Sequence, residues 1–102
     1  MDKVQIATNQ IQRGMVLKII HEAQPLGAGL EVITAVLKQH GHALDREAVM
    51  TLCKYLEGKQ LIHIENLGNA ILKLNRDIAH ITPQGIDVLE GTQAVEGIAL
   101  VD

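Results

Sequence analysis

Arg46, Thr51 and Lys54 have the types and spacing of side chains that together recognise a polar ligand. They fall on a predicted helix, residues 45–58, whose apolar positions recur at helical spacing and leave these three facing outwards. Arg and Lys donate hydrogen bonds to guanine in the DNA major groove, and Thr contacts a base or a thymine methyl group. The pattern therefore indicates base contacts, although Glu47 on the same helix would repel phosphate.

Phosphate contacts need further cations near that helix, because backbone contacts position a protein on DNA. Lys59, Lys73 and Arg76 follow the helix and are candidates for this role. Two features oppose the interpretation. Glu57 lies near the end of the helix, and the predicted turn of residues 66–69 has neither Arg nor Lys.

Metal binding and redox chemistry are not favoured by the histidines and the single cysteine. His40 and His42 lie close together at a helix end, but a structural zinc site takes four ligands. We expect exposed histidines that help to cap the helix, with no metal site and no cofactor. Cys53 falls on the buried face of helix 45–58, so we expect a core thiol.

Catalytic patterns are also missing from the sequence. No nucleophile can be placed beside a base. The glycines of residues 27–29 follow a Pro-containing loop rather than a strand, so they lack the context of a phosphate-binding loop. Asp45 and Glu47 suit a helix N-terminus, where carboxylates cap free N–H groups. We therefore predict that the protein is not an enzyme.

Length and composition indicate one domain. The chain has 102 residues, is 47% hydrophobic and 21% charged, and can therefore bury an aliphatic core. Its net charge of -3 gives no global positive field, so DNA binding requires a local basic face. No apolar run has transmembrane length and no secretory signal is present, so we expect a soluble, cytoplasmic protein without a membrane partner.

The elements that would position these residues begin with three helices. Residues 1–8 are expected to form a lead-in, and Asn9 to cap a helix that ends near Glu22. A second helix, residues 30–40, is expected to end at Gly41 in a left-handed conformation. Its short connection to helix 45–58, which Asp45 caps, makes the pair a helix-turn-helix.

A hairpin and a last helix follow. We expect strands at residues 61–65 and 70–74, joined by the turn at 66–69. Thr82 followed by Pro83 is a strong helix start, and Gly91 ends that helix before a tail, residues 92–102. The sequence thus predicts a winged helix-turn-helix domain over residues 9–91. Its class is mainly α with a small β-hairpin (α+β): three helices, a two-stranded wing and a C-terminal helix.

Three motifs support a resemblance. Residues 81–91, ITPQGIDVLEG, resemble the (I/L)TPxGxxxLEG segment that closes many winged-helix regulators, and residues 55–62, YLEGKQLI, resemble their LExxGLI junction. With the turn GHALDR at residues 41–46, the chain is similar to a family of small winged-helix proteins of Mu-like phages and prophages. The resemblance implies a phage or prophage setting more than a mechanism.

Two functions from different classes remain open. One is a phage-type transcriptional regulator that binds double-stranded DNA with helix 45–58 in the major groove. The other is a protein-interaction module that uses the winged helix as a scaffold for a phage or host protein and binds no DNA. A basic stripe continuous across Arg46, Lys54 and Arg76 favours the first, and a broken stripe with an exposed apolar patch favours the second. Self-association into a homodimer suits both, through Leu17, Tyr55 or the tail.

Overall fold

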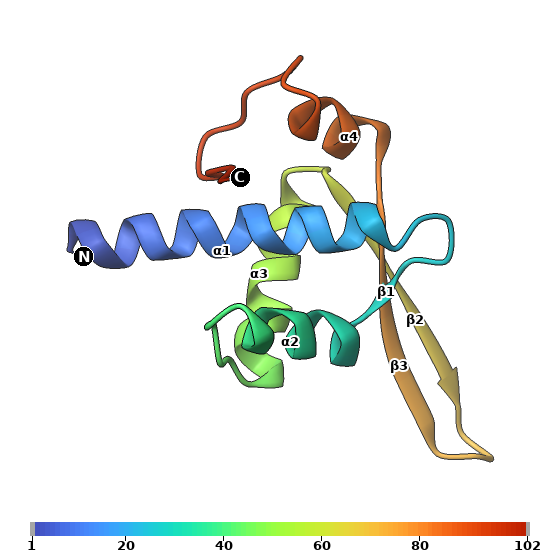
Figure 1. Ribbon diagram of the computed structural model, residues 1–102. Coiled ribbons are helices and arrows are strands. Elements are labelled where there is room, and N and C mark those ends of the chain that lie inside the picture. The colour runs from blue at the N-terminus through green and yellow to red at the C-terminus, as the bar shows by residue number, and fades with distance from the viewer. Residues whose placement is uncertain (1, 102) are drawn as a thin grey trace.

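A long first helix crosses the molecule, and a β-hairpin projects away from the helices at one end (Figure 1). The computed structural model describes residues 2–101. The elements in chain order are α1 (Lys3–Glu22), β1 (Ala28–Gly29), α2 (Leu30–Gln39), α3 (Arg46–Gly58), β2 (Ile62–Asn69), β3 (Leu74–Ile81) and α4 (Pro83–Leu89). This α+β arrangement agrees with the predicted class, and α2 and α3 form the predicted helix-turn-helix.

The start of α1 differs from the prediction. The helix begins at Lys3, where the Asp2 side chain accepts a hydrogen bond from the Gln5 backbone N–H, so the predicted N-cap at Asn9 is wrong. Residues 3–8 are helical, not an irregular lead-in. An Asp at N-cap satisfies one of the free N–H groups at the helix start, and the pattern of apolar residues did not reveal it because these first turns are exposed.

The other helix ends follow the sequence. The Asp45 side chain caps α3 by accepting from the Ala48 backbone N–H, and Thr82 caps α4 by accepting from Gly85. Gly41 has a φ of +87°, as expected of a left-handed residue after α2. These contacts fix where α3 starts, and with it the direction of its exposed side chains.

The core lies among α1, α2 and α3, and it is aliphatic. The predicted stripe of α3 is buried, as are side chains from the two other helices: Val16, Leu17, Ile20, Leu30, Ile33, Leu37, Val49, Leu52, Cys53 and Leu56. Leu17, a candidate for self-association, is completely buried within the chain. It is therefore a core residue and offers no contact to a second copy.

The sheet has three antiparallel strands in the order β1-β3-β2, one more than predicted. The extra strand is Ala28–Gly29, which pairs with Ile78 and Ala79 of β3. The sequence analysis assigned these two residues to a loop. A two-residue strand has no alternation to detect, so only its partner reveals it.

The wing is longer than predicted, and the turn assigned to residues 66–69 is wrong. Those residues belong to β2, where Asn66 pairs with Asp77 and Asn69 pairs with Leu74. The chain reverses at residues 70–73, where the Leu72 N–H donates to the Asn69 side chain and Lys73 has a φ of 55°. Asn and Gly are typical of turns, which explains the error, but here they lie in paired strands.

The C-terminal tail runs back along α1 (Figure 1). The Ala99 N–H donates to the Gln10 carbonyl at 3.1 Å, and Arg13 donates to the Gly97 carbonyl at 3.0 Å. A Cβ on Gly14 would lie 1.9 Å from the Ala99 carbonyl oxygen, so this glycine permits the close approach. The tail therefore covers one side of α1.

Cys53 gives the first prediction. Burial raises the pKa of its thiol from 9.0 to about 12, and the charges of Asp77 and Glu57 add to the rise. Because the thiolate is the reactive form, native protein should resist alkylation by iodoacetamide at about pH 8, while protein unfolded in urea should react readily. Mass spectrometry of both samples checks this, and rapid labelling of the native chain would contradict the burial.

The same pKa shift makes the stability of the folded state depend on pH. The folded pKa lies above the unfolded one, so the contribution of the neutral thiol is complete below about pH 9 and is lost as the pH rises towards 12.

No helix within residues 2–101 is long and apolar enough to cross a membrane.

Candidate nucleic-acid interface

The exposed face of α3 presents the predicted base-contacting residues. Arg46, Thr51 and Lys54 are all exposed on this helix, and Glu47 lies beside them. The Thr51 hydroxyl donates to the Glu47 carbonyl at 3.0 Å. The helix thus offers two cationic donors and one hydroxyl.

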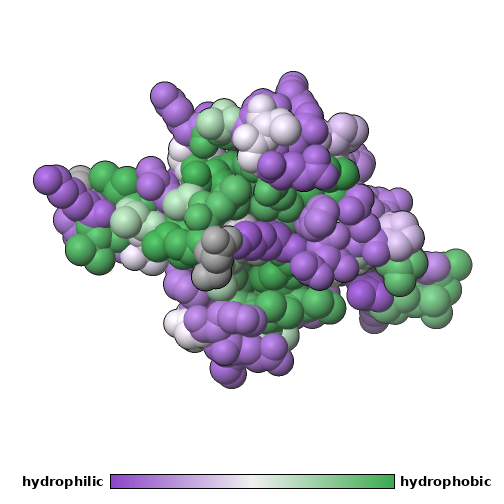
Figure 2. Space-filling view, turned by 45° about the horizontal axis from the view of Figure 1, so that its top comes forward, coloured by the Kyte–Doolittle hydropathy of each residue, from purple (hydrophilic) through white to green (hydrophobic). Residues whose placement is uncertain are grey.

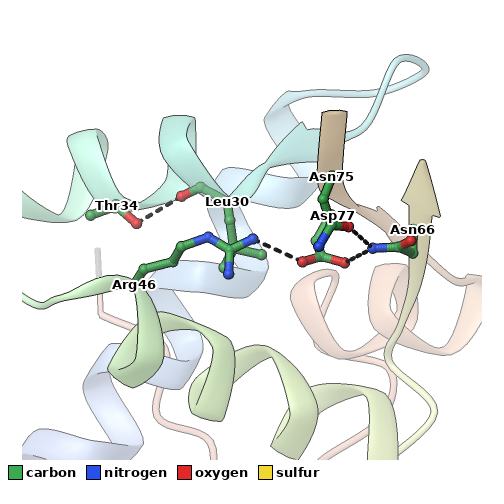
Figure 3. A network of polar contacts seen from close by, with 6 residues as sticks. All are labelled: Leu30, Thr34, Arg46, Asn66, Asn75 and Asp77. Atoms are coloured by element: carbon green, nitrogen blue, oxygen red, sulfur yellow. Dashed lines mark hydrogen bonds and ion pairs between the residues drawn. The ribbon is translucent and has the colours of Figure 1, made fainter. Parts of the chain in front are cut away.

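Arg46 is the best-positioned of these side chains because it belongs to a polar network with the wing (Figure 3). Its Nη2 donates to Asp77 Oδ2 at 3.0 Å. The amide nitrogen of Asn66 donates to Asp77 Oδ1 at 2.8 Å and to Asn75 Oδ1 at 2.7 Å. The Asp77 side chain is only 12% exposed, whereas that of Arg46 is 54% exposed. Asn66 of the wing thus orients the Asp77 carboxylate, and this carboxylate orients the Arg46 guanidinium.

This network leaves Arg46 able to bind another group. A guanidinium has five N–H donors in a fixed fork, and the bond to Asp77 uses one of its nitrogens. Asp77 therefore limits the rotamers of Arg46 without consuming all its donors. It also joins α3 to β3, so the same contact links the helix to the wing. The sequence did not identify Asp77, because the predicted return strand ended at Leu74.

Lys54 also has an acidic neighbour, Glu57, which lies on the same helix. Its Nζ lies 3.9 Å from Glu57 Oε1, and its side chain is 63% exposed. Glu57 Oε2 accepts a hydrogen bond from the Ile64 N–H at 2.9 Å. Glu57 is thus partly engaged in tying β2 to α3, and the exposed pair with Lys54 contributes little to stability.

The three predicted phosphate-contacting residues are exposed but do not form one cluster. Lys59 follows α3, and its Nζ lies 5.6 Å from the centre of the Tyr55 ring. Lys73 lies in the turn of the wing, and Arg76 lies on β3 opposite Leu67. The expectation that the turn of the wing has no cation is therefore wrong, because Lys73 occupies it.

Charge is distributed unevenly over this interface. The stripe across Arg46, Lys54 and Arg76, whose continuity would favour DNA binding, is interrupted by Asp77 and Glu57. The distal wing, which we define as residues 66–76, contains Lys73 and Arg76 and no acidic residue. The local positive charge of this chain therefore lies further out on the wing than the sequence suggested.

The histidines are dispersed. His80 contacts Glu65 at 3.1 Å, and His42 contacts the buried Gln12 at 3.1 Å. Within residues 2–101, no group of three or more His, Cys, Asp and Glu side chains is placed to hold a metal ion.

Tyr55 connects α3 to the tail. The guanidinium of Arg13 lies 3.7 Å from the centre of its ring, and Arg13 also donates to Gly97. The Tyr55 hydroxyl is directed at the Glu96 carbonyl, 3.4 Å away. Tyr55 is thus occupied within the chain, which weakens its candidacy as a self-association contact.

No protein-family model matches the chain, and no similar curated protein was found. Among solved structures, the chain resembles the MepR–DNA complex of S. aureus, with 21% identity and a TM-score of 0.62 over 86% of this chain and 66% of that one. The chain thus spans slightly less than two thirds of MepR.

In two further solved structures, the match covers a larger share of the other chain. A PadR-like transcription factor from Bacteroides fragilis has 19% identity and a TM-score of 0.66 over 91% of this chain and 87% of that one. A PadR family transcriptional regulator from Eggerthella lenta has 21% identity and a TM-score of 0.60, over 89% and 80%. At these identities the similarity concerns the fold: this chain has the winged-helix fold of these transcriptional regulators. The phage setting stays a prediction.

Proposed function

We propose that this protein is a DNA-binding transcriptional regulator that places α3 in the major groove and the distal wing over the neighbouring backbone and minor groove. The observation that carries the proposal is the network of Arg46, Asp77 and Asn66, which links an exposed guanidinium of α3 to the wing, whose distal part (residues 66–76) contains no acidic residue. The fold shared with transcriptional regulators, one of them crystallised with DNA, supports the same conclusion.

The residues divide into two roles. Arg46, Thr51 and Lys54 contact base edges, because they lie on the exposed face of α3. The second group holds phosphates from the positions that flank this face: Lys59, Lys73 and Arg76. The chain as a whole is acidic, so the binding depends on these local cations.

A homodimer would suit this function, because a two-fold dimer reads two half-sites. The first turns of α1 extend beyond the rest of the molecule (Figure 1) and expose Val4 (76%) and Ile6 (42%). We propose that these turns contribute to the dimer contact, in place of the buried Leu17.

The alternative function is an interaction module that binds a protein and not DNA. Two observations favour it: Asp77 and Glu57 interrupt the basic stripe, and apolar side chains are exposed on the wing. Whether the chain binds DNA distinguishes the two functions, and the next experiment measures this.

The second prediction is a steep salt dependence of DNA binding. Genomic fragments from the source of the gene are captured on the immobilised full chain at low and moderate salt. If three cations per protomer neutralise phosphates, the logarithm of the binding constant should fall with the logarithm of salt at a slope of about −2.7 per protomer. Selective recovery of particular fragments with such a slope supports the proposal.

Failure to retain any fragment at low salt would contradict DNA binding. It would favour the interaction module, which a partner pull-down would then identify. Retention without sequence preference would contradict the proposed base contacts of α3. The proposed phosphate contacts would still stand.

A further inference from the structure

The apex of the wing exposes more apolar surface than a solvated turn needs. Ile71 is 92% exposed and Leu72 is 65% exposed, with Leu67 (46%) and Leu74 (50%) on the strands below them. Figure 2 shows this group as the apolar projection at the right-hand end of the molecule. These side chains contribute nothing to the core, so their exposure calls for a binding partner.

The apex is also well defined in conformation. Asn69 accepts a hydrogen bond from the Leu72 N–H at 3.0 Å, and Lys73 adopts the left-handed conformation that completes the reversal. Below it, Asn66 links the two strands through Asn75 and Asp77. The two apical side chains are therefore presented on a braced hairpin that extends away from the helices (Figure 1).

The charge around the apex selects the partner. Lys73 is adjacent to Leu72, Arg76 lies on the same arm, and the distal wing has no Asp or Glu, although the chain carries a net charge of -3. Apolar residues whose only charged neighbours within the distal wing are cations match a duplex groove, which has base faces inside and phosphates along both edges. The minor groove is about 6 Å wide, so it admits the side chains of a hairpin apex but not the hairpin itself.

We propose that Ile71 and Leu72 form an apolar wedge that enters the DNA minor groove and partly unstacks a base step, while Lys73 and Arg76 bind the flanking phosphates. The proposal rests on the proposed DNA-binding function and adds to it a bend in the bound duplex. Inserted aliphatic side chains kink DNA by about 20–90° towards the major groove. Flexible pyrimidine–purine steps would be the preferred sites.

The test compares the full chain with the double variant I71S/L72S on a duplex that the unmodified protein recovers from genomic fragments. Fluorophores at the two ends report bending, and 2-aminopurine at a pyrimidine–purine step reports unstacking. The unmodified protein should raise both signals. The variant should lose both and bind about tenfold more weakly, because the wedge contributes apolar contact and a better fit to the bent duplex.

A matched control is L26S, which removes an equally exposed aliphatic side chain (83% exposed) from the loop before β1. It should bind and bend the duplex as the unmodified protein does. Circular dichroism checks that both variants remain folded, which is expected because neither site contributes to the core.

Four results would overturn the wedge. Undiminished bending and unstacking by I71S/L72S would do so while leaving DNA binding intact. A change of sedimentation in I71S/L72S would make the apex a protein contact, and apex-dependent binding to vesicles of anionic lipid without a DNA bend would make it a membrane contact. If the unmodified chain recovers no duplex at all, the proposed function fails and the wedge with it.

Discussion

Replacing Leu56 by Ala is expected to lower the free energy of unfolding by about 2–5 kcal/mol, because the side chain is completely buried in α3 and its removal leaves a cavity among helices that cannot fully collapse. Urea denaturation followed by circular dichroism measures the loss. The midpoint should fall while the dependence on urea stays the same, since the folded state should remain equally compact.

The control for Leu56→Ala is Val32→Ala, which truncates a β-branched aliphatic side chain that is 52% exposed on α2. Its effect should stay within about 0.5 kcal/mol, as is usual for surface positions. An equally small effect at Leu56 would mean that α3 buries a different face. The exposed positions of Arg46, Thr51 and Lys54 would then be wrong as well.

The helical part of the fold could be predicted because its signals are local. The spacing of Val49, Leu52, Cys53 and Leu56 defines the buried face of α3, and Asp45 and Thr82 satisfy N–H groups within one turn of themselves. Such signals need no knowledge of the rest of the chain.

Apart from the start of α1, the errors concern contacts between residues that are not close in the sequence. β1 exists only through β3, and the position of the turn in the wing depends on the pairing of Asn66 with Asp77. The tail is ordered through Gly14 and Gln10, about ninety residues earlier in the chain. Gly14 within a helical pattern was the one available signal, since such a glycine often marks a close approach.

The candidate site was predicted in its residue types but not in its organisation. Exposure of Arg46 and Lys54 follows from the buried stripe of α3, whereas Asp77, which holds Arg46, lies on a strand that the predicted hairpin did not reach. The shift of the turn also moved Lys73 to the apex and Leu67 onto a strand. A register error therefore concealed both the positioning carboxylate and the cationic, apolar wing.

Replacing Arg46 by Ala is the substitution with the largest expected effect on DNA binding. A bidentate contact with a base is worth about 1–3 kcal/mol, so we expect the affinity for the recovered duplex to fall by roughly 5- to 150-fold. Fluorescence anisotropy at constant salt measures the change. Because Asp77 keeps its bond from Asn66, the variant should remain folded, which thermal unfolding checks.

Three companion variants separate the roles within this contact. Lys18→Ala removes a charge from the part of α1 that contacts the tail and should leave binding nearly unchanged. Arg46→Lys keeps the charge but loses the planar fork, so it should recover only part of the affinity if Arg46 contacts a base in the bidentate geometry and nearly all of it if Arg46 contacts only phosphate. Asp77→Ala should reduce affinity less than Arg46→Ala, because it frees the guanidinium without removing it. Equal affinity of Arg46→Ala and the unmodified protein would exclude Arg46 from the interface, and the link between α3 and the wing would then serve stability alone.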